Sequence, residues 1–121
     1  MPQVFRISEA HLQAFSAQQR QRFESEMVAY FKQHHPRQAA QLGDDGLREL
    51  IAEGTEKAKT YDLYREVDVA RYLQFMVAIR RDFDDCSELP WAHEILTSER
   101  WLAPDKLERI AQRWTQSPTE T

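Results

Sequence analysis

Hydrophobic residues recur at helical spacing along most of the chain, and they are densest between Val67 and Phe83. In this stretch they form two adjacent stripes, Val69–Leu73–Met76 and Tyr72–Phe75–Ile79–Phe83. Together the stripes are wider than the apolar face of about 100° that a surface helix needs. The pattern therefore predicts a central helix over about 66–83, buried on most of its circumference and wet along a polar strip at positions 71, 74 and 81. A buried strand is the alternative, but the stretch is too long and no Gly, Pro or Asn bounds it closely.

A long amphipathic helix is predicted before this central one. Ser8 is a suitable N-cap residue, and apolar residues follow it at intervals of three or four up to His34. The helix must end before Pro36, because the residue that precedes a proline is disfavoured in the helical region. Its polar face is expected to be solvated, although an oligomer contact there stays open.

Pro36 can open a short helical turn that Gly43 closes, after which Asp44 or Asp45 can cap a further helix that reaches residue 61. Gly54 and Ala58 lie four residues apart on its apolar face. Because Gly inside a helix costs about 1 kcal/mol, this pair predicts a close helix crossing.

Two shorter helices are predicted after a polar loop that follows residue 83. Pro90 opens the first, with Trp91, Ile95 and Leu96 facing inward. Pro104 lies early in the second, whose buried stripe is Leu107, Ile110, Ala111 and Trp114. We expect an all-α protein, a single compact bundle of five to six helices in one domain over 1–114, with a disordered tail over 115–121.

Composition agrees with a small helical globular protein. The 121 residues are 41% hydrophobic and 30% charged, with three glycines. The net charge of −4, with both signs interleaved, disfavours a nucleic-acid partner. One cysteine excludes an internal disulfide, and the chain offers neither a signal-peptide pattern nor an apolar run that could span a membrane. A cytoplasmic protein is expected.

Candidate chemistry is sparse. The acidic run at Asp82, Asp84, Asp85 and Glu88 fails as a calcium loop, because Ser87 and His93 stand where Gly and Glu are required. The adjacent His34 and His35 cannot chelate as an i, i+4 pair, and carboxylates near Cys86 disfavour its thiolate. No nucleophile elbow, phosphate loop or dinucleotide motif is present. We therefore predict no metal, no cofactor and no enzymatic activity.

Aromatic residues are the remaining signal. Trp91 and Trp114 fit buried stripes, whereas Trp101, beside Arg100, and Tyr64, close to Tyr61, lie on no buried stripe. Exposed aromatic residues near arginine are typical of protein-binding hot spots. We predict that Tyr61, Tyr64, Arg100 and Trp101 include a partner-binding patch.

Several phrases occur together along nearly the whole chain: I-S at 7–8, F-x-x-x-M at 23–27, H-x-P at 34–36, L-G-D-D-G-L-R at 42–48, Y-D-L-Y-R-E-V-D-V-A-R-Y-L at 61–73, D-F-D at 82–84 and P-W-A-x-x-I-L at 90–96. This set resembles a family of small helical accessory proteins encoded beside spike (VgrG, PAAR) and toxin genes in type VI secretion clusters.

The resemblance implies a non-enzymatic co-chaperone that binds the effector, or the adaptor chaperone that loads the effector onto the spike. An immunity protein that neutralises a cognate toxin is the alternative. The resemblance does not indicate which surface of the protein binds the partner, or which oligomeric state the protein has.

Overall fold

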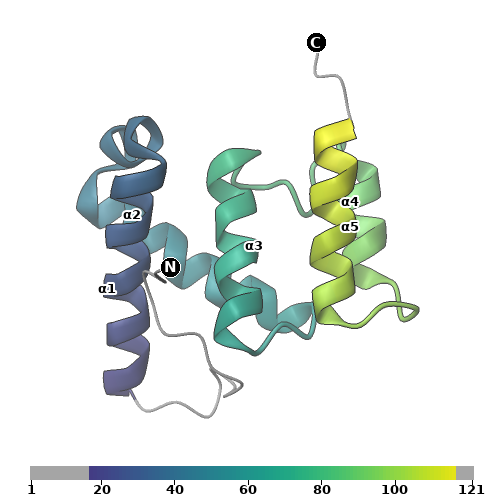
Figure 1. The fold of residues 1–121 in the computed structure, drawn as a ribbon, viewed down its shortest axis with the longest axis horizontal. Helices are drawn as coiled ribbons and strands as arrows, with labels where there is room; N and C mark the ends of the chain where they lie inside the picture. The colour runs from purple at the N-terminus through teal and green to yellow at the C-terminus, as the bar shows by residue number, and fades with distance from the viewer. Residues whose placement is uncertain (1–16, 117–121) are drawn as a thin grey trace. The chain divides into compact units, whose positions relative to one another are not determined.

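The computed structural model describes residues 17–116, and all regular secondary structure in that range is helical (Figure 1). Five helices follow one another along these residues: α1 (Ala17–His34), α2 (Pro36–Thr60), α3 (Glu66–Ala78), α4 (Pro90–Thr97) and α5 (Ala103–Gln116). The predicted all-α class is confirmed, and the helix count lies within the predicted five to six.

The chain divides into two compact units after Arg81. The first unit contains α1, α2 and α3, in which α1 packs on α2 and α2 packs on α3. The second unit contains α4 and α5, which pack on each other. The expected single domain over 1–114 stays a prediction. The expected tail over 115–121 lies largely outside the described residues.

Helix α1 buries one face, formed by Phe23, Met27, Val28 and Phe31. The helix ends at His34, directly before Pro36, as predicted. The predicted start at Ser8 lies outside the described residues. The rest of α1 is less buried, and its exposed Arg22 lies 3.5 Å from Glu66 at the start of α3.

Helix α2 consists of two helical segments joined at Gly43. Pro36 occupies the first turn, and Gly43 has φ 74° and ψ 170°, a conformation that is essentially restricted to glycine. The predicted short turn of helix, its closure at Gly43 and the following longer helix are therefore confirmed. In that longer part, the residues on the predicted apolar face are buried: Leu47, Leu50, Ile51, Gly54 and Ala58.

Helices α2 and α3 approach closely at Gly54. A Cβ atom built at this position would lie 2.6 Å from the Met76 sulfur and would also collide with the Leu73 side chain. Both partners are buried residues of α3. The missing side chain thus permits the close crossing that the small residues predicted.

Helix α3 is shorter than predicted, because it ends at Ala78 and not near Phe83. Three aspartates follow within residues 82–85, and aspartate is a poor helix former that is also unfavourable at the negative end of the helix dipole. The predicted burial is largely correct, because most of the helix surface is covered. Its less buried strip passes through Val67, Arg71, Gln74 and Ala78.

The turn between α2 and α3 is a Schellman motif. The Leu63 amide donates a hydrogen bond to the Ala58 carbonyl, and the Asp62 amide donates to the Lys59 carbonyl, each at 3.0 Å. Asp62 has φ 65°, the left-handed conformation that this motif requires. Leu63 and Ala58 are both fully buried, so this turn lies against the core of the first unit.

In the second unit α4 begins at Pro90, as predicted, and α5 spans the predicted last helix. Leu96, Leu107 and Ile110 are buried in agreement with the predicted stripes. Trp91, Ile95, Ala111 and Trp114 are only half-buried, so the prediction that they face fully inward is wrong. Two helices of 8 and 14 residues offer too narrow a surface to enclose side chains of this size completely.

Replacing Gly54 by Ala should lower the free energy of unfolding by about 1–2 kcal/mol, because overpacking a core costs about 1–3 kcal/mol and the helix propensity gained is at most about 1 kcal/mol. Urea denaturation of both proteins measures the difference. Gly46→Ala is the matched control, since a Cβ there meets only the Leu42 side chain at 3.2 Å or more. Equal stability of the two variants would contradict the close crossing.

Replacing Asp62 by Gly should raise the free energy of unfolding by about 0.5–1 kcal/mol, because glycine adopts the left-handed conformation without the steric cost of a Cβ. Thermal denaturation of the variant and the wild type measures this change. Ala52→Gly, at an exposed position in the interior of the longer segment of α2, should instead destabilise by about 1 kcal/mol. A loss of stability in Asp62→Gly would show that the aspartate side chain itself supports the turn.

Candidate functional site

The four residues predicted to bind a partner lie in two different units. Tyr61 is the C-cap residue of α2, and Tyr64 follows in the turn to α3; both are half-buried. The Tyr61 ring lies 6.1 Å, centroid to centroid, from the ring of Tyr72, which is fully buried in α3. Tyr61 therefore contributes to packing in the first unit as well as to its surface.

Arg100 and Trp101 lie together in the loop between α4 and α5 of the second unit. The Arg100 guanidinium carbon is 5.5 Å from the centre of the Trp101 ring. Trp101 is half-buried, and the next residue, Leu102, is 77% exposed. The predicted association of an accessible aromatic residue with arginine is thus present at this pair.

Two arginines of α5 extend the same arrangement. The Arg109 guanidinium carbon is 3.4 Å from the centre of the Trp101 ring, and that of Arg113 is 5.4 Å from the centre of the Trp91 ring. Both arginines are exposed. We call the residues that carry these contacts, together with the adjacent exposed Leu102, the arginine–tryptophan surface: Trp91, Arg100, Trp101, Leu102, Arg109 and Arg113.

A shallow hollow of about 220 Å³ adjoins this surface. Its lining residues come from the loop and from the outer face of α5: Trp101, Asp105, Glu108, Arg109 and Gln112. The side-chain amide of Gln112 donates a hydrogen bond to Glu108 at 3.4 Å. The hollow thus combines an aromatic ring with charges of both signs, a composition that suits contact with another polypeptide.

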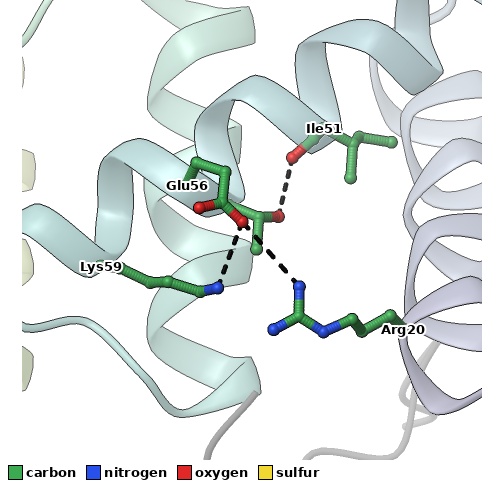
Figure 2. A network of polar contacts seen from close by, with 5 residues as sticks. Arg20, Ile51, Glu56 and Lys59 are labelled. Atoms are coloured by element: carbon green, nitrogen blue, oxygen red, sulfur yellow. Dashed lines mark hydrogen bonds and ion pairs between the residues drawn. The ribbon is translucent and has the colours of Figure 1, made fainter. Parts of the chain in front are cut away.

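A second hollow, of about 170 Å³, lies between α1 and α2 in the first unit, and ion pairs run along it. Figure 2 shows Arg20 of α1 extending toward Glu56 of α2, at 3.9 Å, while Lys59 approaches the same carboxylate at 3.1 Å. The Thr55 hydroxyl, next to Glu56 in the chain, donates a hydrogen bond to the Ile51 carbonyl at 2.7 Å. These charges satisfy one another, so the network joins the two helices.

A buried carboxylate lies at the start of α3. Glu66 is 1% exposed, and neither of its carboxylate oxygens accepts a hydrogen bond from the described residues. Arg22 of α1 lies 3.5 Å from Glu66 and also 3.5 Å from Glu26. Burial raises the pKa of Glu66, the positive charge of Arg22 opposes this, and the negative charge of Glu26 adds to it.

Two further groups of the first unit titrate away from their usual range. Burial, and then the neighbouring His34, lower the pKa of His35, which disfavours its charged form. A hydrogen bond from Lys32, at 2.8 Å, and its positive charge lower the pKa of Asp44. Both groups lie near the junction of α1 and α2, where they support local structure.

The acidic loop of the second unit is folded onto itself. Asp84 is buried, and Nδ1 of His93 donates a hydrogen bond to the Asp84 carbonyl at 3.1 Å. The sulfur of buried Cys86 accepts a hydrogen bond from the Glu88 amide at 3.3 Å. Among residues 17–116, no three His, Cys, Asp or Glu side chains are grouped so that they could hold a metal ion.

Four residues of the arginine–tryptophan surface were missed by the sequence analysis: Leu102, Arg109 and Arg113, which it did not single out, and Trp91, which it expected to be buried. The spacing of the two arginines, i and i+4 on the polar face of α5, was a usable signal. The path of the loop that brings Trp101 against Arg109 was not visible in the sequence, since no periodic pattern covers residues 98–102.

No protein-family model matches this chain, and neither the curated proteins nor the solved structures contain a significant match. Within the described part of the chain, no helix has both the length and the apolar character that crossing a membrane requires.

Replacing Glu66 by Gln should change how stability depends on pH. Because the pKa of Glu66 is raised on folding, the folded protein keeps a proton that the unfolded chain loses, and the free energy of unfolding falls as the pH rises above about 4.5. The neutral amide removes this contribution, so the stability of Glu66→Gln relative to wild type should increase from acidic to neutral pH.

Urea denaturation at a series of pH values measures this difference, in which the titration of all other groups largely cancels. Glu49→Gln, at an exposed position of α2, controls for the loss of one negative charge. If the difference in free energy of unfolding between Glu66→Gln and wild type does not vary with pH, the raised pKa of Glu66 is contradicted.

Proposed function

We propose that this protein is a non-enzymatic protein-binding factor that acts through the arginine–tryptophan surface. The observation that carries the proposal is the exposure of Leu102 beside the half-buried Trp101, with three arginines on the tryptophan rings. Tryptophan and arginine are the residues most enriched in binding hot spots. Among the described residues, Leu102 is the large hydrophobic side chain that is exposed.

The biological setting that we propose comes from the resemblance to accessory proteins of type VI secretion clusters. In this setting the protein is a cytoplasmic co-chaperone that binds the effector-loading adaptor, or the effector itself, before secretion. This role requires a stable fold and an accessible surface for the partner. It requires no catalytic step.

Leu102→Asp should abolish or strongly weaken binding to such a partner, because a charge would replace an exposed apolar contact without disturbing the core. Trp101→Ala should weaken binding by about 2 kcal/mol or more if it is a hot spot. Co-purification of the tagged full chain with the adaptor and effector encoded beside it, followed by calorimetry, measures both effects.

Ala40→Asp, at an exposed position of α2, is the matched control for the introduced charge and should bind as the wild type does. Failure to recover either the adaptor or the effector would refute the loading role. Protection of a toxin-producing cell by this chain alone, without an adaptor complex, would indicate an immunity protein instead.

A further inference from the structure

The arginines of the two units have different partners. In the first unit most basic side chains lie within 4 Å of a carboxylate: Arg20, Arg22, Lys32, Arg48, Lys59, Arg65 and Arg81. Within the described part of the second unit, no ion pair involves Arg100, Arg109 or Arg113, and the recorded side-chain contacts of these three are with tryptophan rings.

A guanidinium group on an aromatic ring keeps its hydrogen-bonding capacity. Its five N–H donors lie in the plane of the group, whereas the ring contacts one face of that plane. The 3.4 Å separation of Arg109 from Trp101 is that of direct stacking. Since Arg109 is exposed, its donors can reach a carboxylate of another molecule in the two-point geometry that arginine favours.

The spacing of these donors follows from α5. Arg109 and Arg113 are four residues apart and lie on successive turns, with Cβ atoms about 5–6 Å apart in such a pair. Leu102, exposed beside Trp101, adds an apolar contact at the same surface. A complementary partner would therefore carry carboxylates about one helical turn apart and an aliphatic side chain beside them.

Two acidic residues of the hollow favour a polypeptide partner over a nucleic acid. Asp105 and Glu108 line the hollow together with Arg109, so a continuous array of phosphates would meet repulsion there. The chain as a whole also has a net charge of −4. Discrete carboxylates on a polypeptide can face the arginines and avoid these two acids, whereas a nucleic-acid backbone carries a charge at every residue.

We propose that the arginine–tryptophan surface binds an acidic segment of a protein partner, with carboxylates on Arg109 and Arg113 and an aliphatic side chain against Trp101 and Leu102. This inference rests on the proposed function, because it specifies the partner chemistry of the same surface.

The test uses the full chain and a short fluorescent peptide with two Glu residues one helical turn apart and a Leu between them. Fluorescence anisotropy compares it with the same peptide carrying Gln in place of Glu. The Glu peptide should bind roughly tenfold or more tightly than the Gln peptide, because a carboxylate can accept two hydrogen bonds from one guanidinium group and a neutral amide cannot. Arg109→Gln and Arg113→Gln should each remove most of this preference.

Arg37→Gln is the matched control, since Arg37 is an exposed arginine of the first unit and should not affect the peptide. Arg109→Lys should not restore binding, because an ammonium group lacks the planar two-point geometry. Equal binding of the Glu and Gln peptides, or binding that survives Arg109→Gln, would overturn the inference. A phosphopeptide or an RNA oligonucleotide that binds more tightly than the Glu peptide would overturn the choice of partner.

Co-purification with the adaptor and effector is carried out in parallel, so that the two proposals can fail separately. Recovery of a partner that depends on Leu102, without a preference for the Glu peptide, removes this inference and leaves the proposed function. A clear Glu preference without recovery of either protein removes the secretion role and leaves the acidic-segment surface.

Discussion

The close contact of α2 and α3 at Gly54 is the constraint on which the first unit depends. With no side chain at this position, the backbone of α2 meets Leu73 and Met76 directly. The left-handed Asp62 closes the Schellman turn that joins α2 to α3. The missing Cβ at Gly54 and this tight turn together allow Leu73 and Met76 of α3 to pack directly against α2.

Charged residues contribute to the two units in different ways. In the first unit, carboxylates and basic groups on different helices pair across α1, α2 and α3, as Arg48 does with Glu24 at 2.8 Å. Such exposed pairs contribute little stability individually, about 0–1 kcal/mol, but they leave few charges available to other molecules. In the second unit, tryptophan rings hold the arginines, and a ring does not neutralise the charge. Most basic groups of the first unit thus have a carboxylate partner, whereas Arg100, Arg109 and Arg113 of the second unit contact tryptophan rings and keep their hydrogen-bond donors.

Most of the fold could be predicted because periodicity reports burial directly. The apolar spacing located the described helices, and Gly54 with Ala58 indicated the close crossing. The end of α3 was misplaced, because apolar periodicity continues through Phe83 although the aspartates around it cannot continue the helix. The Arg100–Trp101 pair was found from residue type alone. The contact of Arg109 with the Trp101 ring depends on the path of a loop that has no periodic pattern, so only the structure could reveal this contact.

The buried side of α5 determines what its exposed side can bind. Leu107 and Ile110 are fully buried, and this fixes the rotation of the helix about its axis. Arg109 then lies far around the helix from Leu107, whereas Arg113, three residues after Ile110, lies at the edge of the buried face, and both are exposed. The Trp101 ring, whose centre is 3.4 Å from the Arg109 guanidinium carbon, restricts that side chain. An arginine that is already held loses less conformational entropy on binding, a saving of about 0.5–1.5 kcal/mol for each side chain. Core packing in this small unit thereby keeps Arg109 exposed and in contact with the Trp101 ring.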